Sequence, residues 1–448
     1  MRFRRWLQPG IGVKRWLGLV FVGLLLLALG AAHVIRQITP DLTPGSTIAA
    51  IVDLITLGFL PFPLRGLIAG GIGALLVAIG AWRLILALTG PLRADEDQPL
   101  VEVIYQKRFL ARGPKVVAIG GGTGLSTLLR GMKEHTSNLT AIVTVADDGG
   151  SSGALRTELG IPPVGDIRNC IAALADAEPL MSELLGYRFP GAGPEGAPGE
   201  PAETEPGGLA GHAVGNLIIA ALTALEGGDF EEGVRRMNRV LAVRGQVVPA
   251  SPTPITLHAE TLDGEVISGQ STVMRTAGIR RVWLAPREVA ASEDALAAIA
   301  EAEIIVLGPG SLYTSVLPVL MIPKIREAVA AAQAIRIYAC NVATQVGETS
   351  GFDLANHVEA LLGHTSPGLV DIVLANDRIT ARPGAMDPKA VALRWPPAAD
   401  PVPHLATEDV VDPREPHHHD PERLAAAILR AWEREAPALR RERIARSA

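Results

Sequence analysis

Residues 116–126 of this chain read VVAIGGGTGLS, an apolar run that passes directly into a glycine-rich turn. A continuously apolar run of this kind is typical of a strand that is buried on both faces. The helical segment LSTLLRGMKEH follows from Leu125. Glycines at such a turn let the backbone approach a ligand closely, and the free N–H groups at the start of a helix favour a phosphate group. A tight turn that binds nothing is the alternative interpretation.

The same pattern recurs downstream, where Ala/Leu-rich helical runs separate four more apolar runs at 141–146, 304–307, 335–340 and 370–375. This alternation predicts an α/β domain at 113–395, with a mainly parallel sheet and flanking helices. The runs ITLHAET and VISGQS flank Asp263-Gly264, and they predict a β-hairpin within 255–271, at one side of the sheet. The Pro/Gly-rich segment 190–208 is expected to be a flexible insertion.

Residues 396–448 are expected to form an irregular linker and then a helix that begins at Asp420-Pro421. The linker contains three consecutive histidines at 417–419. Consecutive residues cannot share one face of a helix or strand. We therefore interpret the three histidines as an exposed feature and not as a metal site.

Two adjacent acids, Asp147 and Asp148, end the second predicted strand within the run DDGGSSG. Neighbouring carboxylates repel each other unless a cation or hydrogen-bond donors compensate. A Mg²⁺ ion held by this pair, or the hydroxyl groups of a ligand, would provide that compensation. A surface turn rich in Asp and Ser is the alternative interpretation.

Four of the polar loops, at 120, 147, 308 and 341, follow the carboxyl ends of predicted parallel strands. Ligands bind at that edge of open α/β sheets, so we expect one phosphate-binding cleft there. Asp166 could instead be a helix cap and Arg168 a solvated side chain, while His212 and Asn216 could be structural polar groups. The expected ligand-binding residues are Gly120, Gly121, Gly122, Thr123, Gly124, Ser126, Asp147, Asp148, Ser151, Ser152, Asp166, Arg168, Asn169, His212, Asn216, Gly308, Gly310, Ser311, Tyr313, Thr314, Asn341 and Gln345.

Standard nucleotide and nucleophile motifs do not occur in this sequence. The first glycine loop departs from GxGxxG because Leu125 and Thr127 occupy the wrong positions, and no GK[ST] occurs. No serine lies in GxSxG, and both cysteines, Cys170 and Cys340, have apolar neighbours. A catalytic residue cannot be assigned from these patterns.

The N-terminal region, 1–112, contains two long apolar runs. The 20 residues 16–35 carry no formal charge, and at 1.5 Å per residue a helix of that length covers the roughly 30 Å hydrocarbon layer. The run 66–88 would span as well if Arg83 reaches the interface. We therefore expect two transmembrane helices before the α/β domain, with a re-entrant or interfacial segment at 48–64. A cleaved signal peptide is the alternative for the first run.

The distribution of charge predicts how this region is oriented. Five basic residues precede the first span, two lie between the spans and four follow the second, which favours a multi-pass protein of the inner (plasma) membrane with both ends in the cytoplasm. The whole chain has 448 residues and a net charge of −6. Residues 1–112 hold 12 basic and 6 acidic side chains, so the remaining 29 basic and 41 acidic ones leave −12 on the rest. An acidic body argues against binding of nucleic acid.

Several long motifs resemble those of the gluconeogenesis-factor (YvcK) family, in order, from about residue 114 to about 432. They are VVAIGGGTGLSTLLRGMKEHTSNLTAIVTVADDGGSSGALRTELG, GDIRNCIAALAD, GHAVGNLIIAALT, VLAVRGQVVP, LGPGSLYTSVLP and CNVATQVGET. The resemblance implies a Rossmann-like fold that binds a nucleotide sugar, UDP-N-acetylglucosamine. It further implies a regulator of cell shape and peptidoglycan synthesis during growth on gluconeogenic carbon sources, with a protein partner in cell-wall synthesis.

The same superfamily contains the phospholactate transferases (CofD), which transfer a phospholactyl group to a deazaflavin with Mg²⁺. That branch shares the first glycine loop and the double acid, but it does not resemble the run Gly149–Gly153. The resemblance therefore favours a ligand-binding regulator that requires no cofactor, with a Mg²⁺-dependent transferase as the alternative. A membrane-tethered scaffold that binds proteins is a third hypothesis.

Overall fold

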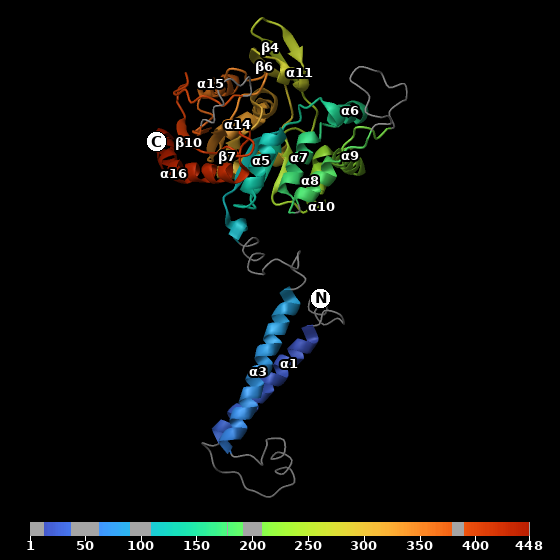
Figure 1. Ribbon diagram of the computed structural model, residues 1–448, viewed down its shortest axis with the longest axis vertical. Coiled ribbons are helices and arrows are strands. Elements are labelled where there is room, and N and C mark those ends of the chain that lie inside the picture. The colour runs from blue at the N-terminus through green and yellow to red at the C-terminus, as the bar shows by residue number, and fades with distance from the viewer. Residues whose placement is uncertain are drawn as a thin grey trace. The chain divides into compact units, whose positions relative to one another are not determined.

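In the described part of the chain, a seven-stranded sheet forms the centre of the larger of two units (Figure 1). The units are Met1–Lys107 and Arg108–Ala448, and this computed structural model describes residues 13–36, 62–89, 109–176, 178–190, 208–378 and 389–447. The strand order is β10-β9-β8-β7-β1-β2-β3 and every neighbouring pair is parallel. The strands are β1 (Val116–Gly120), β2 (Leu139–Val143), β3 (Gln246–Pro249), β7 (Ile304–Leu307), β8 (Ile335–Ala339), β9 (Ile372–Asn376) and β10 (His404–Glu408).

The prediction of a mainly parallel α/β sheet is confirmed, and all five predicted strands form. The second one begins and ends earlier than expected, at Leu139–Val143. The sequence analysis did not identify β3 and β10. The strand β10, HLATE, is an edge strand with one buried residue, so it lacks the apolar run that marks the central strands.

The order of the strands reverses at the centre of the sheet. From β1 the chain proceeds through β2 to β3 on one side, and it then returns to place β7 on the other side of β1. The carboxyl ends of β1 and β7 therefore flank a topological switch point. In open α/β sheets, this is where the loops diverge and leave a crevice for a ligand.

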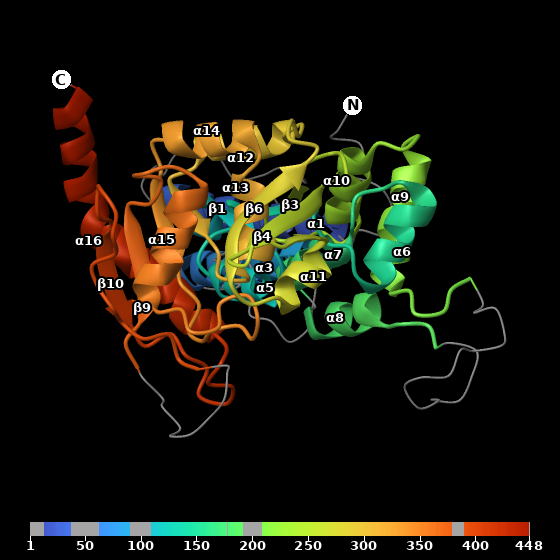
Figure 2. The same ribbon diagram turned by 90° about the horizontal axis from the view of Figure 1, so that it is seen from above.

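Helices cover both faces of the sheet (Figure 2). The helices α5, α7 and α16 contact β1, β2, β3, β8 and β9, while α12 and α14 lie side by side along another side of the molecule. The described helices of this unit are η3 (Leu110–Arg112), α5 (Gly122–Met132), α6 (Gly150–Leu159), α7 (Gly165–Leu174), α8 (Glu178–Gly186), α9 (Val214–Leu225), α10 (Phe230–Val240), α11 (Gln270–Arg275), α12 (Glu293–Glu301), η4 (Leu312–Val316), α13 (Leu317–Leu320), α14 (Pro323–Ala331), α15 (Leu354–His364) and α16 (Pro421–Ser447).

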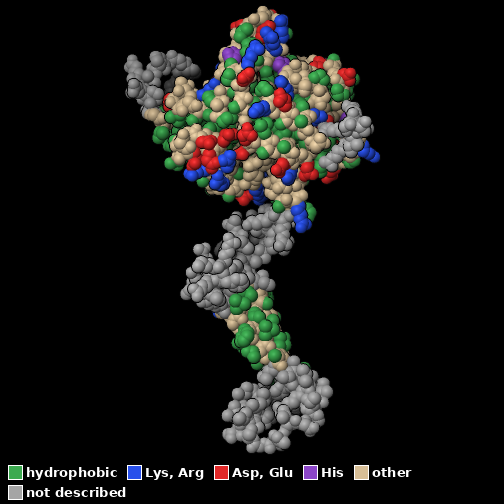
Figure 3. All heavy atoms as spheres, turned by 180° about the vertical axis from the view of Figure 1, so that it is seen from behind, with side chains coloured by type: hydrophobic (Ala, Val, Ile, Leu, Met, Phe, Trp, Pro, Cys, Tyr) green, Lys and Arg blue, Asp and Glu red, His purple; other side chains and the backbone are tan. Residues whose placement is uncertain are grey.

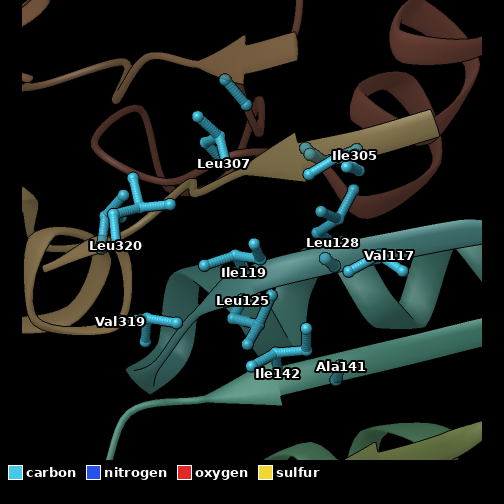
Figure 4. Packing of buried hydrophobic residues seen from close by; sticks show 14 of the residues in the cluster. Val117, Ile119, Leu125, Leu128, Ala141, Ile142, Ile305, Leu307, Val319 and Leu320 are labelled. Atoms are coloured by element: carbon cyan, nitrogen blue, oxygen red, sulfur yellow. The ribbon is translucent and has the colours of Figure 1, made fainter. Parts of the chain in front are cut away.

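The hydrophobic core surrounds β1, whose five residues are all buried. Burial of a side chain as large as Ile119 stabilises the fold by about 1.5–3 kcal/mol. Figure 4 shows this packing between β1, α5, β2, β7 and α13, with the labelled residues Val117, Ile119, Leu125, Leu128, Ala141, Ile142, Ile305, Leu307, Val319 and Leu320. The core thus fixes the two strands whose loops flank the switch point.

The predicted hairpin forms, and its strands are not part of the parallel sheet. Its strands β4 (Thr256–Thr261) and β5 (Val266–Ser268) join β6 (Ile279–Ala285) in a separate antiparallel sheet of order β5-β4-β6. The reason is that β6 pairs with β4 along Thr256–Thr261 and completes a second sheet. The helix α11 connects β5 to β6 and contacts β4 and β5.

The smaller unit contains two described helices, α1 (Val13–Arg36) and α3 (Phe62–Thr89), which pack against each other. Within the described residues, α3 has one stretch, Leu67–Leu84, that is long and apolar enough to cross a membrane, while the apolar stretch of α1, Arg15–Ala28, is shorter. Figure 3 shows mostly hydrophobic side chains on the helices of this unit. The segment expected to re-enter the membrane, 48–64, lies almost entirely outside the described residues.

The C-terminal helix α16 begins at Pro421, as predicted, and packs on α5 at Gly131. A Cβ atom on Gly131 would overlap with the carbonyl oxygen of Pro421. We expect Gly131→Ala to lower the free energy of unfolding by about 1–3 kcal/mol because the two helix backbones would have to separate. Denaturant titration of the full chain would measure this change.

The matched control is Gly363→Ala in α15, where a Cβ atom meets nothing within 4 Å. Alanine is the better helix former, so this change should be neutral or stabilising by up to about 1 kcal/mol. Equal destabilisation by the two changes would show that the contact between α5 and α16 does not require glycine.

Candidate functional site

A cavity of 940 Å³ opens at the switch point. Residues from the loops after β1, β2, β7 and β8 line it, and α11 and residues 417–419 contribute further walls. Its volume falls within the range of about 300–1,000 Å³ that is typical of small-molecule sites. All four loops that the sequence analysis placed at this edge contribute to the lining.

The two glycine loops touch each other through their backbones. A Cβ atom on Gly124 would lie 2.7 Å from the carbonyl oxygen of Pro309 and 2.8 Å from the Cα of Gly310. Gly122 has a φ of +62° and open space where its Cβ would be. Only glycine adopts this conformation without strain, and its missing side chain leaves the start of α5 open.

Two carboxylates face the cavity, and they are Asp147 and Asp166, not the expected pair Asp147 and Asp148. Asp166 is part of the first turn of α7, and its carboxyl group accepts a hydrogen bond from the backbone of Gly122. A Cβ atom on Gly121 would collide with the Oδ2 of Asp166, so the glycine loop and this acid are in contact. Asp148 is not part of the cavity lining, because its Oδ1 accepts a hydrogen bond of 2.9 Å from the N–H of Ser271 in α11.

The two cavity acids hold protons more tightly than ordinary carboxyls. Burial, followed by the charge of Asp147, raises the pKa of Asp166 to about 6. Burial also raises the pKa of Asp147, and the nearby charge of Asp148 adds to the shift. The Arg168 guanidinium opposes the shift at Asp166 but does not cancel it. A cation that entered between Asp147 and Asp166 would relieve this unfavourable charge.

The loop after β7 is held in shape by three side chains from the segment after β8. Asn341 makes two hydrogen bonds of 3.0 Å with the backbone of Gly310. Its Oδ1 accepts from the N–H group, and its Nδ2 donates to the carbonyl oxygen. The Nε2 of Gln345 donates to the Oγ of Ser311 at 2.7 Å. The Oε1 of Glu348 accepts from the backbone N–H groups of two residues at the start of η4, Tyr313 and Thr314, and the Thr314 hydroxyl donates to Oε2 at 3.1 Å.

Glu348 is a buried carboxyl that the sequence analysis missed. Glu348 is 1% exposed, and burial raises the pKa of its carboxyl to about 7. The three hydrogen-bond donors stabilise the charged form but do not cancel this effect. The role of Glu348 is to satisfy the backbone at the start of η4. Tyr313 and Thr314, which were expected to bind a ligand, are consequently buried away from the cavity at 2% and 0% exposure.

A second group of expected ligand residues forms a polar network behind the cavity wall. Ser151 Oγ lies 3.1 Å from the Nδ1 of His212 and accepts from the amide of Asn216 at 2.9 Å. Arg168 donates to the side-chain oxygens of Asn216, at 3.1 Å, and Asn169, at 2.8 Å. These polar groups form hydrogen bonds with one another, and the bonds connect α6, α7 and α9 around the acids. None of these side chains lines the cavity.

The structure therefore divides the expected site residues into two sets. The first set lines the cavity and comprises Gly121, Gly122, Thr123, Gly124, Asp147, Asp166, Gly310, Ser311, Asn341 and Gln345. The second set does not line it and comprises Gly120, Ser126, Asp148, Ser151, Ser152, Arg168, Asn169, His212, Asn216, Gly308, Tyr313 and Thr314.

Two parts of the wall were not identified from the sequence. One is α11, which contributes Gln270, Ser271, Met274 and Arg275. The other is the histidine run at 417–419: His417 and His418 are exposed, as interpreted, but all three residues line the cavity and His419 is only 8% exposed. An isolated β-bridge joins His419 to Val411 in the segment between β10 and α16, and it fixes the local turn that carries the histidines.

The change Asp166→Asn should stabilise the fold increasingly as the pH rises. Because the pKa of Asp166 is raised from 3.8 to about 6, the folded state retains a proton between these pH values that the unfolded state has released. The stability contributed by the protonated carboxyl is complete below about pH 4 and is lost as the pH rises through about 6. Between pH 4 and pH 7.5, we expect the unfolding free energy of the variant to gain up to about 3 kcal/mol over wild type.

Urea unfolding at the two pH values would measure this gain. Asp263→Asn, in the exposed turn between β4 and β5, is the control for the removal of a carboxylate outside the cavity. A pH-independent difference for Asp166→Asn would mean that burial does not raise the pKa of this carboxyl.

Comparison with protein families gives a match to the model described as 2-phospho-L-lactate transferase CofD, over residues 116–404. A putative gluconeogenesis factor from Nostoc is 45% identical over 363 residues, which cover 80% of this chain and 75% of that protein. The gluconeogenesis factor of Bacillus subtilis is 48% identical over 268 residues, which cover 60% of this chain and 80% of that protein.

The match to a putative gluconeogenesis factor of Deinococcus radiodurans is longer, at 37% identity over 96% of this chain and 90% of that protein. The crystal structure of a member of the UPF0052 family from Bacillus halodurans superposes with a TM-score of 0.61 at 39% identity, and it covers 71% of this chain and 99% of that one. The chain therefore belongs to the gluconeogenesis-factor family of CofD-like (UPF0052) proteins.

Proposed function

We propose that the α/β unit binds a nucleotide sugar, UDP-N-acetylglucosamine or a close relative, and acts as a regulator without converting it. The observation that carries the proposal is the cavity at the switch point, where two glycine loops meet beside two carboxylates. The open start of α5 at Gly122 suits a phosphate group, since helix N-termini favour anions. Carboxylates such as Asp147 suit the hydroxyl groups of a ribose or sugar.

A Mg²⁺ ion fits the acids of this cavity. Among the described residues, no group of three or more His, Cys, Asp or Glu side chains could hold a metal ion by itself. Mg²⁺, however, is usually bound by one or two carboxylates together with phosphates of the substrate. Asp147 and Asp166 would hold it, and the ion would neutralise charge between them and the diphosphate.

The transferase alternative is supported by the CofD match and by these same two acids. It requires an acceptor pocket for a deazaflavin, a ring system that commonly stacks on aromatic side chains. The described residues that line the cavity include no Phe, Tyr or Trp. Ligand binding without phosphoryl transfer is therefore the better match to this cavity.

The physiological part of the proposal is control of cell shape and peptidoglycan synthesis during growth on gluconeogenic carbon sources. Its support is the similarity to proteins named gluconeogenesis factors: those of Nostoc, Bacillus subtilis and Deinococcus radiodurans are 37–48% identical to this chain over the matched residues. A regulator must report its ligand to another protein, so the proposal includes a protein partner in cell-wall synthesis.

We further propose that α1 and α3 form two transmembrane helices that anchor the protein in the inner membrane. Glycines bring the two helices into backbone contact, because a Cβ on Gly73 would lie 2.7 Å from the amide nitrogen of Leu27. Close packing through small residues is the usual way in which helices associate in lipid. Leu67 and Trp82 of α3 are 75% and 69% exposed, so water would contact a large apolar surface.

The N-terminal unit is shared with at least one relative. The Deinococcus match covers 96% of this chain, so about 18 of 448 residues lie outside it, far fewer than the 107 of Met1–Lys107. Most of this unit therefore has a counterpart in that protein, as expected of a functional anchor.

Titration calorimetry tests the ligand. The full-length chain in a mild detergent should bind UDP-N-acetylglucosamine in the presence of Mg²⁺, and Asp147→Asn should weaken binding by about tenfold or more because a charged contact is lost. Asp263→Asn, outside the cavity, serves as the control. Clear binding of guanosine diphosphate with none of UDP-sugars, together with phospholactyl transfer to a deazaflavin, would instead establish the transferase alternative.

Cysteine accessibility tests the topology. Both native cysteines are buried, and burial raises the pKa of Cys340 to about 12, so they should not react with thiol reagents. A cysteine replacing Thr43, between the proposed spans, should be labelled from outside intact cells. One replacing Glu102 should be labelled only after permeabilisation. Both positions lie outside the described residues, and labelling at position 102 from outside would refute the cytoplasmic location.

A further inference from the structure

Arg275 is the only Arg or Lys among the described residues that line the cavity. It is the last residue of α11, and its side chain is exposed. No hydrogen bond or ion pair joins this side chain to another described residue, whereas Arg156, Arg168 and Arg188 all have partners. The guanidinium group of Arg275 is thus available to a ligand.

The backbone that carries Arg275 is held at both ends of α11. At the beginning, Gly269 has a φ of +97° and packs against Asp148, whose Oδ1 accepts the hydrogen bond from Ser271. At the end, Gly347 lies against Arg275, where a Cβ would be 2.8 Å from the Arg275 carbonyl carbon. The helix is therefore fixed on the cavity wall while the long side chain of Arg275 remains unpaired.

The charges of the cavity define what this side chain can bind. Asp147 and Asp166 repel an anion, and a hydrogen bond to Asp166 already engages one backbone donor of the glycine loop, at Gly122. Even with Mg²⁺ between the two acids, a positive group on another wall would strengthen the binding of a diphosphate. A guanidinium is always charged, and its planar fork matches two phosphate oxygens.

We propose that Arg275 binds the diphosphate of the ligand, and that Asp148 is a positioning residue that holds α11 so that Arg275 faces the cavity. The identity of the ligand rests on the proposed function. The assignment also gives the two adjacent acids different tasks: Asp147 lies in the cavity, and Asp148 anchors the wall that carries the positive charge.

Calorimetry on the full-length chain tests this assignment with two probes, UDP-N-acetylglucosamine and inorganic pyrophosphate, each with Mg²⁺ and at two salt concentrations. Arg275→Ala should weaken both by about 10- to 100-fold, as expected for a hydrogen bond between charged groups, and should reduce the salt dependence of binding. Arg275→Lys should retain part of the affinity. Arg280→Ala is the matched control, because Arg280 lies exposed on β6 outside the cavity.

The role of Asp148 is tested by a double-mutant cycle. Asp148→Ala should weaken both probes in the wild-type background and have little further effect when Arg275 is already alanine. Equal effects in the two backgrounds would overturn the positioning role. Thermal unfolding of Arg275→Ala should match wild type, since the side chain is exposed and unpaired.

The outcomes separate this inference from the proposed function. Binding of both probes by Arg275→Ala within about twofold of wild type would overturn the inference and leave the proposed function standing. Pyrophosphate binding that depends on Arg275, without binding of UDP-N-acetylglucosamine, would uphold the inference and refute the nucleotide sugar. Failure of the wild-type chain to bind either probe would refute both.

Discussion

The contact between the two glycine loops is the constraint on which the cavity depends. The strands β1 and β7 are neighbours in the sheet, so the loops that follow them must diverge within a few residues or fill the crevice with side chains. At Gly124 and Gly310 the backbones meet directly, and a Cβ on Gly124 would lie 2.8 Å from the nitrogen of Gly310. Because no side chains occupy this contact, the two loops pack closely and leave the cavity open beside them.

The surrounding residues hold these loops in shape, and several of them line the cavity as well. Asn341, Gln345 and Glu348 each bond to the loop after β7, and the carboxyl of Asp166 bonds to the loop after β1. Buried polar groups need partners, and a loop backbone that leaves regular structure has several to satisfy. Some residues that the sequence predicts as ligand-binding, such as Asn341 and Asp166, therefore form hydrogen bonds with the backbone of the loops.

This distinction explains how far the sequence could predict the structure. The five central strands were predictable, because strands buried on both faces, such as Ile304–Leu307, are continuously apolar. Their carboxyl ends then placed the four loops at one edge. Which of two adjacent acids faces the cavity was not predictable, because it depends on Ser271, 123 residues further along the chain, which engages Asp148.

Close approach through glycine recurs in the N-terminal unit, where it has a different consequence. In the α/β unit, glycines keep side chains out of a crevice whose walls are fixed by a large buried core. Among the described residues of α1 and α3 there is no such core. The glycines at 23, 73 and 80 bring one backbone against the other, while most of the large apolar side chains described there are exposed. Packing between backbones holds two helices together, but it does not remove Leu67 or Trp82 from water. The proposed membrane anchor would account for this pair, because a lipid bilayer, unlike water, imposes no cost on an outward-facing leucine.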